Sequence, residues 1–240
     1  MAVKILSTLA LKGVLEKFRA PLERAAGPLE LAFDATQAIL PRVRAGEAGD
    51  LLILTAEAIA ELRAAGIVGE TWTLGCSGVG LAVRAGAARP DIGSAEALKS
   101  ALLAAASVAH SKVGASGIYF SQVLERLGIA DRLKKRVVVE KGPVGLAVAR
   151  GEAELGVQQL CELLPVAGID IVGPLPPELQ KLTCFAAGIR ARPSDPSAVA
   201  ALAAWLRTSE ARAAMAAGGV IRRGRSGPGP SPCSRPRRSP

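Results

Sequence analysis

The first third of the chain alternates between short aliphatic runs and segments whose apolar residues recur at helical spacing. This alternation predicts strands of a mostly parallel sheet, joined by helices that pack on both faces. The chain is therefore expected to have an α/β fold. In order, the predicted elements are strand 3–6, helix 11–26, strand 29–33, helix 34–45 with Asp34 as its N-cap, strand 50–54 and helix 56–65.

A second series of elements begins at Gly78 and ends in a long amphipathic helix. Two series predict two lobes, which would face each other with the carboxyl ends of their strands, where open α/β sheets bind ligands. A cleft between such lobes closes by a hinge motion. We expect 1–80 to begin lobe 1, 81–185 to form lobe 2 and 186–220 to return to lobe 1. The second series comprises strands at 78–83, 107–110, 137–139, 155–159, 169–172 and 182–189, and helices at 94–105, 118–127, 143–150 and 196–216.

The net charge of +9 is concentrated at the C-terminus. Residues 221–240 hold six arginines and no acidic residue, which leaves +3 for residues 1–220. Their richness in Pro, Ser, Gly and Arg predicts a disordered basic tail over 221–240. This tail contains no aromatic residue on which a base could stack, so no specific nucleic-acid partner is expected.

The four cysteines are widely spaced and form no C-x-x-C pair, and the chain contains a single histidine. We therefore expect neither a metal site nor another cofactor. Cys76, Cys161 and Cys184 are expected to be buried free thiols. No apolar run reaches the ~18 residues of a membrane helix, and the first residues resemble a strand more than a secretory signal. The chain as it stands is expected in the cytoplasm, or in the periplasm if a leader has been removed, and as a monomer.

The segment 114–120, Gly-Ala-Ser-Gly-Ile-Tyr-Phe, predicts an anion site. Small residues that lead into a helix gather free backbone N–H groups at the positive end of the helix dipole. Ser116 adds a hydroxyl donor, and Gly117 lets a ligand approach the backbone. An ordinary capped helix is the alternative interpretation of the same residues.

Five segments taken together resemble the molybdate-binding periplasmic proteins of ABC transporters. That family has the type II periplasmic-binding-protein fold, with two α/β lobes and an oxyanion in the cleft. The resemblance spans about residues 3–220 and implies a small anionic ligand and a transporter permease as partner. The segments are Ile5–Ala10, Phe33–Thr36, Arg44–Asp50, Ala115–Tyr119 and Glu154–Val157.

Carried over by position, the family's ligand contacts match this chain in part. A serine of the family falls on Ala10, which lacks the hydroxyl, and another falls on Thr36, which keeps it. Backbone donors fall on Ser116 and near Val144, and a tyrosine falls on Gln159. A donor missing from a dry site costs roughly 1–3 kcal/mol, which weakens the case for molybdate itself. The full predicted ligand set is Thr8, Ala10, Lys12, Thr36, Ser116, Gly117, Val144 and Gln159.

The runs at 7–13 and 156–159 also resemble the aconitate isomerases, which look like enzymes built on the same fold. This second resemblance implies an allylic proton shift on a tricarboxylate, which needs a base and groups that hold carboxylates. His110 is the candidate base, and Lys12 is a candidate partner for a carboxylate or an alternative base. A histidine without a chemical role and a solvated lysine are the alternatives. The sequence thus favours a solute-binding protein for a small anion, with an isomerase as the second hypothesis.

Overall fold

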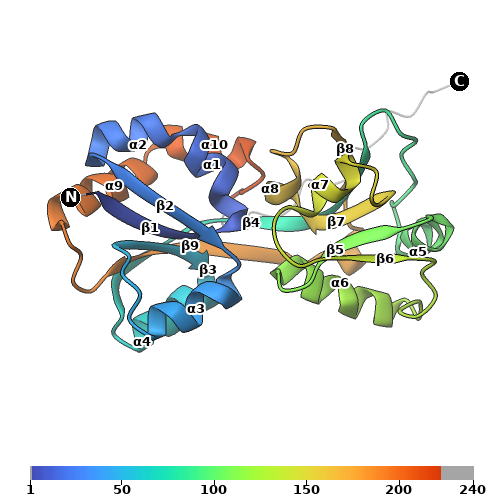
Figure 1. The fold of residues 1–240 in the computed structure, drawn as a ribbon, viewed down its shortest axis with the longest axis horizontal. Coiled ribbons are helices and arrows are strands. Elements are labelled where there is room, and N and C mark those ends of the chain that lie inside the picture. Colours follow the sequence, from blue (N-terminus) through green and yellow to red (C-terminus); the bar gives the residue numbers. More distant parts are fainter. Residues whose placement is uncertain (1, 223–240) are drawn as a thin grey trace, which may run out of the picture.

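The long strand β4, Val68–Arg84, belongs to both halves of the molecule. In this computed structural model, which describes residues 2–222, β4 pairs with β9 (Leu182–Arg190) as far as Gly78. From Val79 onward it pairs with β7 (Leu155–Gln159) instead, close to the boundary expected at residue 80. Figure 1 shows β4 and β9 running between the two lobes. The first half of β4 was not predicted as a strand, although Trp72, Leu74 and Cys76 alternate there with polar or small residues.

Lobe 1 is a sheet of five strands covered by helices on both faces (Figure 1). Strands β2 (Leu29–Asp34), β1 (Val3–Thr8) and β3 (Leu51–Thr55) are parallel, and β9 runs antiparallel to β3. Aliphatic side chains alternate between the two faces, so Leu51 and Ile53 pack on one core while Leu52 and Leu54 pack on the other. The covering helices are α1 (Lys12–Lys17), α2 (Arg19–Ala26), α9 (Pro196–Leu206) and α10 (Ser209–Ala217) on the first face, and α3 (Thr36–Arg44) and α4 (Ala56–Ala64) on the second.

Lobe 2 repeats this plan with a second sheet, made of β8 (Ile169–Pro174), β4, β7, β5 (Val108–Ser111) and β6 (Arg136–Val139). Strand β5 is parallel to β6 and to β7, whereas β4 is antiparallel to β7 and to β8. The parallel strands of both lobes therefore end toward the space between the lobes. The remaining elements of lobe 2 are α5 (Ala95–Ala104), α6 (Ala115–Arg126), α7 (Val144–Ala149), α8 (Leu160–Leu163) and the 3-10 turn η2 (Pro177–Leu179).

Several helices begin or end at residues other than those predicted. The segment 11–26 is divided into the 3-10 turn η1 (Leu9–Leu11), α1 and α2, and the final helix breaks where Thr208 accepts a hydrogen bond from Ala211 N and starts α10. Helix α6 begins at Ala115 instead of residue 118. The N-cap of α3 is Ala35 and not Asp34, because the Asp34 carboxylate accepts a hydrogen bond from Ala35 N at 2.8 Å before the helix begins.

Cys76 and Cys184 form a disulfide between β4 and β9, so the expectation of free thiols at these two positions is wrong. The two cysteines are directly opposite in the antiparallel register. Cys76 directs its backbone N–H and C=O away from β9 to Ile221, which leaves the cysteines as a close, non-hydrogen-bonded pair. Cys161 is free and buried, as predicted.

The pairing of Ile221 with Cys76 also corrects the predicted start of the basic tail. The chain is still ordered against β4 at this residue, since both backbone hydrogen bonds of the bridge form, at 2.7 and 2.9 Å. Residues 223–240 of the predicted tail, with Cys233, lie outside the described residues.

Candidate functional site

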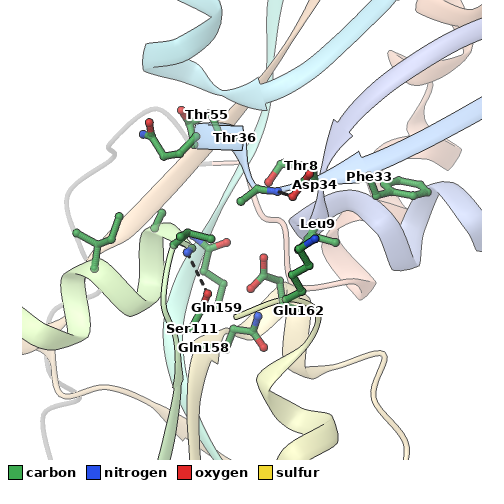
Figure 2. A pocket seen from close by; sticks show the side chains of 18 of the residues that line it. Thr8, Leu9, Phe33, Asp34, Thr36, Thr55, Ser111, Gln158, Gln159 and Glu162 are labelled. Atoms are coloured by element: carbon green, nitrogen blue, oxygen red, sulfur yellow. Dashed lines mark hydrogen bonds between the residues drawn. The ribbon is translucent and has the colours of Figure 1, made fainter. Parts of the chain in front are cut away.

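A cavity of about 350 Å³ lies between the two lobes. From lobe 1, the ends of β1, β2 and β3 and the start of α3 line it, and from lobe 2, the end of β5, the start of α6, residues 140–142, β7 and α8. Figure 2 shows Thr8, Asp34, Thr36 and Thr55 on one side and Ser111, Gln158, Gln159 and Glu162 on the other. The cavity therefore occupies the place that the strand order predicts for a ligand.

Two helices from opposite lobes begin at this cavity. Thr36 and Gln37 open α3, and Ala115 opens α6, and all three line the cavity. Neither Ala35 nor Gly114, the two N-caps, provides a side-chain cap. Within the described residues, no hydrogen bond forms from the backbone N–H groups of Thr36, Gln37, Ala115 and Ser116. Free N–H groups at two positive helix ends make a site for an anion.

Two buried hydroxyl groups lie at the same two helix starts. The Oγ1 atom of Thr36 and the Oγ atom of Ser116 are buried and have no hydrogen-bond partner among the described residues. Thr36 lines the cavity, whereas Ser116 is buried and is not among the residues that line it. Buried polar groups are nearly always paired, so the unpaired Thr36 hydroxyl in the cavity wall indicates a place for a ligand atom. Thr8 also lines the cavity.

The loop that leads into α6 is held by Ser111, which the sequence analysis did not select. Its Oγ atom accepts a hydrogen bond from Gly114 N at 3.0 Å, and its side chain lines the cavity. Gly117 does not line the cavity, and its role is one of packing. A Cβ atom at this position would lie 1.8 Å from the Ser111 carbonyl oxygen, so only glycine lets α6 approach β5 this closely.

Gln158 and Gln159 both line the cavity, although neighbouring side chains of a strand point to opposite faces of the sheet. The Gln158 side chain turns to the start of α7, where its Oε1 atom accepts from Val144 N at 2.8 Å. The Val144 N–H group, expected as a ligand donor, is therefore already bonded, and Val144 is not part of the cavity wall. Gln159 keeps its predicted place in the wall.

Glu162 is the carboxyl group that the sequence analysis missed. It lies on the short helix α8 directly after β7, half-buried, and lines the cavity. Burial raises the pKa of Glu162 to about 7, although a hydrogen bond from Gln158 works against this shift. The other charged residues of the wall are Asp34, Glu140 and Lys141. A glutamate three residues beyond a strand end was the available signal, and no motif distinguished it.

The structure places three other predicted residues outside this wall. Ala10 is buried in the apolar core of lobe 1. Lys12 lies beside a neighbouring cavity. His110 is buried, with Nδ1 3.1 Å from the Ser111 carbonyl oxygen and Nε2 3.1 Å from an Arg136 nitrogen. Burial is the largest cause that lowers its pKa, and the charge of Arg136 lowers it further. Both ring nitrogens of His110 thus contact other groups of the protein, and His110 does not line the cavity.

The described residues contain no group of three or more His, Cys, Asp or Glu side chains arranged to hold a metal ion. Among the helices of the described part, none has the length and apolar character needed to cross a membrane. The groups available in the cavity are backbone amides, hydroxyls, glutamine amides, carboxyl groups and the ammonium group of Lys141.

Comparisons with known proteins agree with this arrangement. The profile of a family described as bacterial extracellular solute-binding protein matches residues 6–220. A protein named aconitate isomerase from a Pseudomonas species is 36% identical over 226 residues, which are 90% of this chain and 86% of that protein.

Solved structures share the fold at low sequence identity. The periplasmic molybdate-binding protein of Azotobacter vinelandii superposes with a TM-score of 0.76 at 18% identity, over 92% of this chain and 100% of that one. A tungstate ABC transporter structure from Geobacter sulfurreducens gives a TM-score of 0.66 at 12% identity, over 90% and 97% of the two chains. The α/β fold with two lobes that the sequence predicts is confirmed.

Proposed function

We propose that this chain, which belongs to the bacterial extracellular solute-binding protein family, holds a small anion in the cavity between its lobes. The observation that carries the proposal is the convergence of α3 and α6, one from each lobe, on a single cavity. An anion there would accept hydrogen bonds from free N–H groups of both helices and so hold the lobes together. Thr8, Thr36 and Gln159 would add neutral donors.

The proposed setting is extracytoplasmic, with a transporter permease as the partner that receives the ligand. The disulfide between Cys76 and Cys184 supports this setting, because such bonds persist in oxidising compartments and are rare in the cytosol. The family description supports it too. The monomeric state remains a prediction.

A charge placed at the start of α6 tests anion binding directly. Ala115 is the exposed first residue of α6 and lines the cavity, so Ala115→Asp places a carboxylate where the ligand would bind. An acidic residue in the first turn favours the helix, and the fold should persist. We expect thermal shifts with molybdate, tungstate, citrate or the aconitates in the native protein and none in this variant.

Ser209→Asp is the matched control, because Ser209 is the exposed first residue of α10 and lines neither this cavity nor the one beside it. It should bind as the native protein does. Equal binding by the Ala115→Asp variant would refute the proposed site.

The second candidate function is an isomerase that shifts a proton along an unsaturated tricarboxylate. The aconitate isomerase relative suggests it, and Glu162 is the observation that favours it. A base with a pKa near 7 is well suited to take and return a proton at neutral pH. The Glu162 carboxylate would remove a proton from the carbon atom between a carboxylate and the double bond, and would return it at the far end of the allylic system.

No electrons are gained or lost in this shift, because the double bond moves as the proton does. The free N–H groups of α3 and α6 would stabilise the negative charge of the intermediate. We expect Glu162→Gln to abolish interconversion of cis- and trans-aconitate, followed by proton NMR, while binding persists. His110→Ala should remain active, since His110 lies outside the wall. If Glu162→Gln kept its activity and His110→Ala lost it, His110 would be the base.

A further inference from the structure

A second cavity of about 230 Å³ adjoins the first. The two cavities share Leu9, Gln158 and Glu162 in their walls, so they meet at these residues. The second also lies between the lobes, because α1 of lobe 1 forms one side and the start of α7 with residues 165–167 of lobe 2 forms the other. A ligand in the first cavity could therefore extend into the second.

The walls of the second cavity combine an apolar surface with one ammonium group and with the carboxyl groups of Glu16 and Glu162. Pro143, Leu146, Pro165 and Val166 contribute apolar surface, and Lys12 is the cation among the described residues that line it. Burial of a carbon chain against such a surface is favourable, whereas a bare inorganic oxyanion has no apolar part to bury.

The Lys12 ammonium lies beside both cavities. Its Nζ atom is 5.8 Å from the ring centroid of Phe33, which lines the first cavity. Its ion pair with Glu16, 3.7 Å between Nζ and Oε1, joins two side chains that are each about half exposed. Exposed pairs of this kind are weak, so Glu16 leaves the ammonium available to a ligand.

From this arrangement we infer that the ligand is an extended organic polyanion, a di- or tricarboxylate, and that it spans both cavities. One carboxylate binds at the starts of α3 and α6, the carbon chain lies against the apolar wall, and a distal carboxylate pairs with Lys12. This inference rests on the proposed function, since it needs an anion in the first cavity. Lys12 is thereby the residue that selects for length, because a short anion cannot reach it.

Calorimetric titration of the full chain with acids of different length tests the inference. Tricarballylate and trans-aconitate are the long probes, and malonate and molybdate are the short ones. We expect Lys12→Met to weaken binding of the long probes about tenfold or more, since it removes a charged partner, and to leave the short probes unchanged. Lys17→Met is the matched control, because Lys17 lies on the same helix, also faces a phenylalanine ring, and lines neither cavity.

Leu146→Trp provides an independent check. Leu146 is 39% exposed and lines only the second of these two cavities, so a larger side chain should fill that cavity without disturbing the fold. It should weaken the long probes and spare the short ones. Equal losses in the Lys12 and Lys17 variants, or binding of molybdate alone, would overturn the inference and leave the proposed function standing. A native protein that binds none of the probes would overturn both.

Discussion

The Oε1 atom of Gln158 accepts a hydrogen bond from the backbone N–H of Val144 at 2.8 Å. The bond joins β7 to the first turn of α7, and both residues are buried. It therefore satisfies a helix N–H group that the sequence resemblance assigned to a ligand. The site keeps its donors at α3 and α6 but has one fewer at α7.

Replacement of Gln158 by leucine should destabilise the protein because the buried Val144 N–H would lose its partner. We expect a loss of about 1–3 kcal/mol in the free energy of unfolding, measured by urea denaturation. Gln159→Leu is the control, since Gln159 is equally buried but its one hydrogen bond is a weak contact from Cys161 Sγ at 3.9 Å. Equal losses in the two variants would contradict this role of Gln158.

Thr36 and Thr55 both line the cavity, but their hydroxyl groups have different roles. Thr36 Oγ1 has no partner, whereas Thr55 Oγ1 accepts from Ala58 N and caps α4. Thr36→Val should therefore weaken ligand binding about tenfold and leave stability within about 0.5 kcal/mol. Thr55→Val should cost about 1 kcal/mol of stability through the lost cap. Calorimetric titration and thermal unfolding of both variants separate the two roles, and a large loss of stability in the Thr36 variant would speak against its place as a free donor.

The disulfide between Cys76 and Cys184 closes a loop with a sequence separation of 108 residues. A crosslink over such a loop restricts the conformations of the unfolded chain. Its removal should therefore lower the free energy of unfolding by about 2–5 kcal/mol. The double variant Cys76→Ser, Cys184→Ser should unfold at lower denaturant than the native protein. A reducing agent should lower the midpoint of the native protein and leave that of the double variant unchanged. A native midpoint that is insensitive to reduction would argue against the bond.

The raised pKa of Glu162 predicts a pH dependence with a definite sign. Between its ordinary value of 4.5 and about 7, the folded protein holds a proton that the unfolded chain has released. Stability therefore falls as pH rises through this window. Relative to Glu162→Gln, the native protein should lose on the order of 1–3 kcal/mol between pH 4.5 and 7.5.

The same titration should affect the ligand, because an ionised Glu162 repels an anion. The charged groups around it are Asp34, Glu140 and Lys141 in the first cavity and Lys12 and Glu16 in the second. Glu162 is the group whose titration we expect to control anion binding in this window. Anion affinity should rise as pH falls from 8 to 6 in the native protein and vary less in the glutamine variant. Identical profiles would show that Glu162 does not face the ligand.

Helical and strand spacing was enough to predict the α/β class and most elements, because each pattern reports the face that an element buries. Helices were also predicted near Thr36 and Ala115, although with other first residues. Glu162, Ser111 and Gln158 were not predicted as site residues, and the three omissions have a common cause. Their importance depends on which groups surround them in space, and those groups come from segments far apart in the chain.

The sequence by itself predicted the two lobes, helices near Thr36 and Ala115, and Thr36 and Gln159 as residues of the cleft, since each follows from short-range patterns or from a family resemblance. The tertiary structure alone decided that the His110 ring contacts Arg136 and that the Val144 N–H group donates a hydrogen bond to Gln158. It also decided that Cys76 meets Cys184 and that Glu162 lies where two cavities join. These outcomes depend on register and packing between distant strands, and hydrogen bonds, disulfides and pKa shifts form only after that packing brings the groups together.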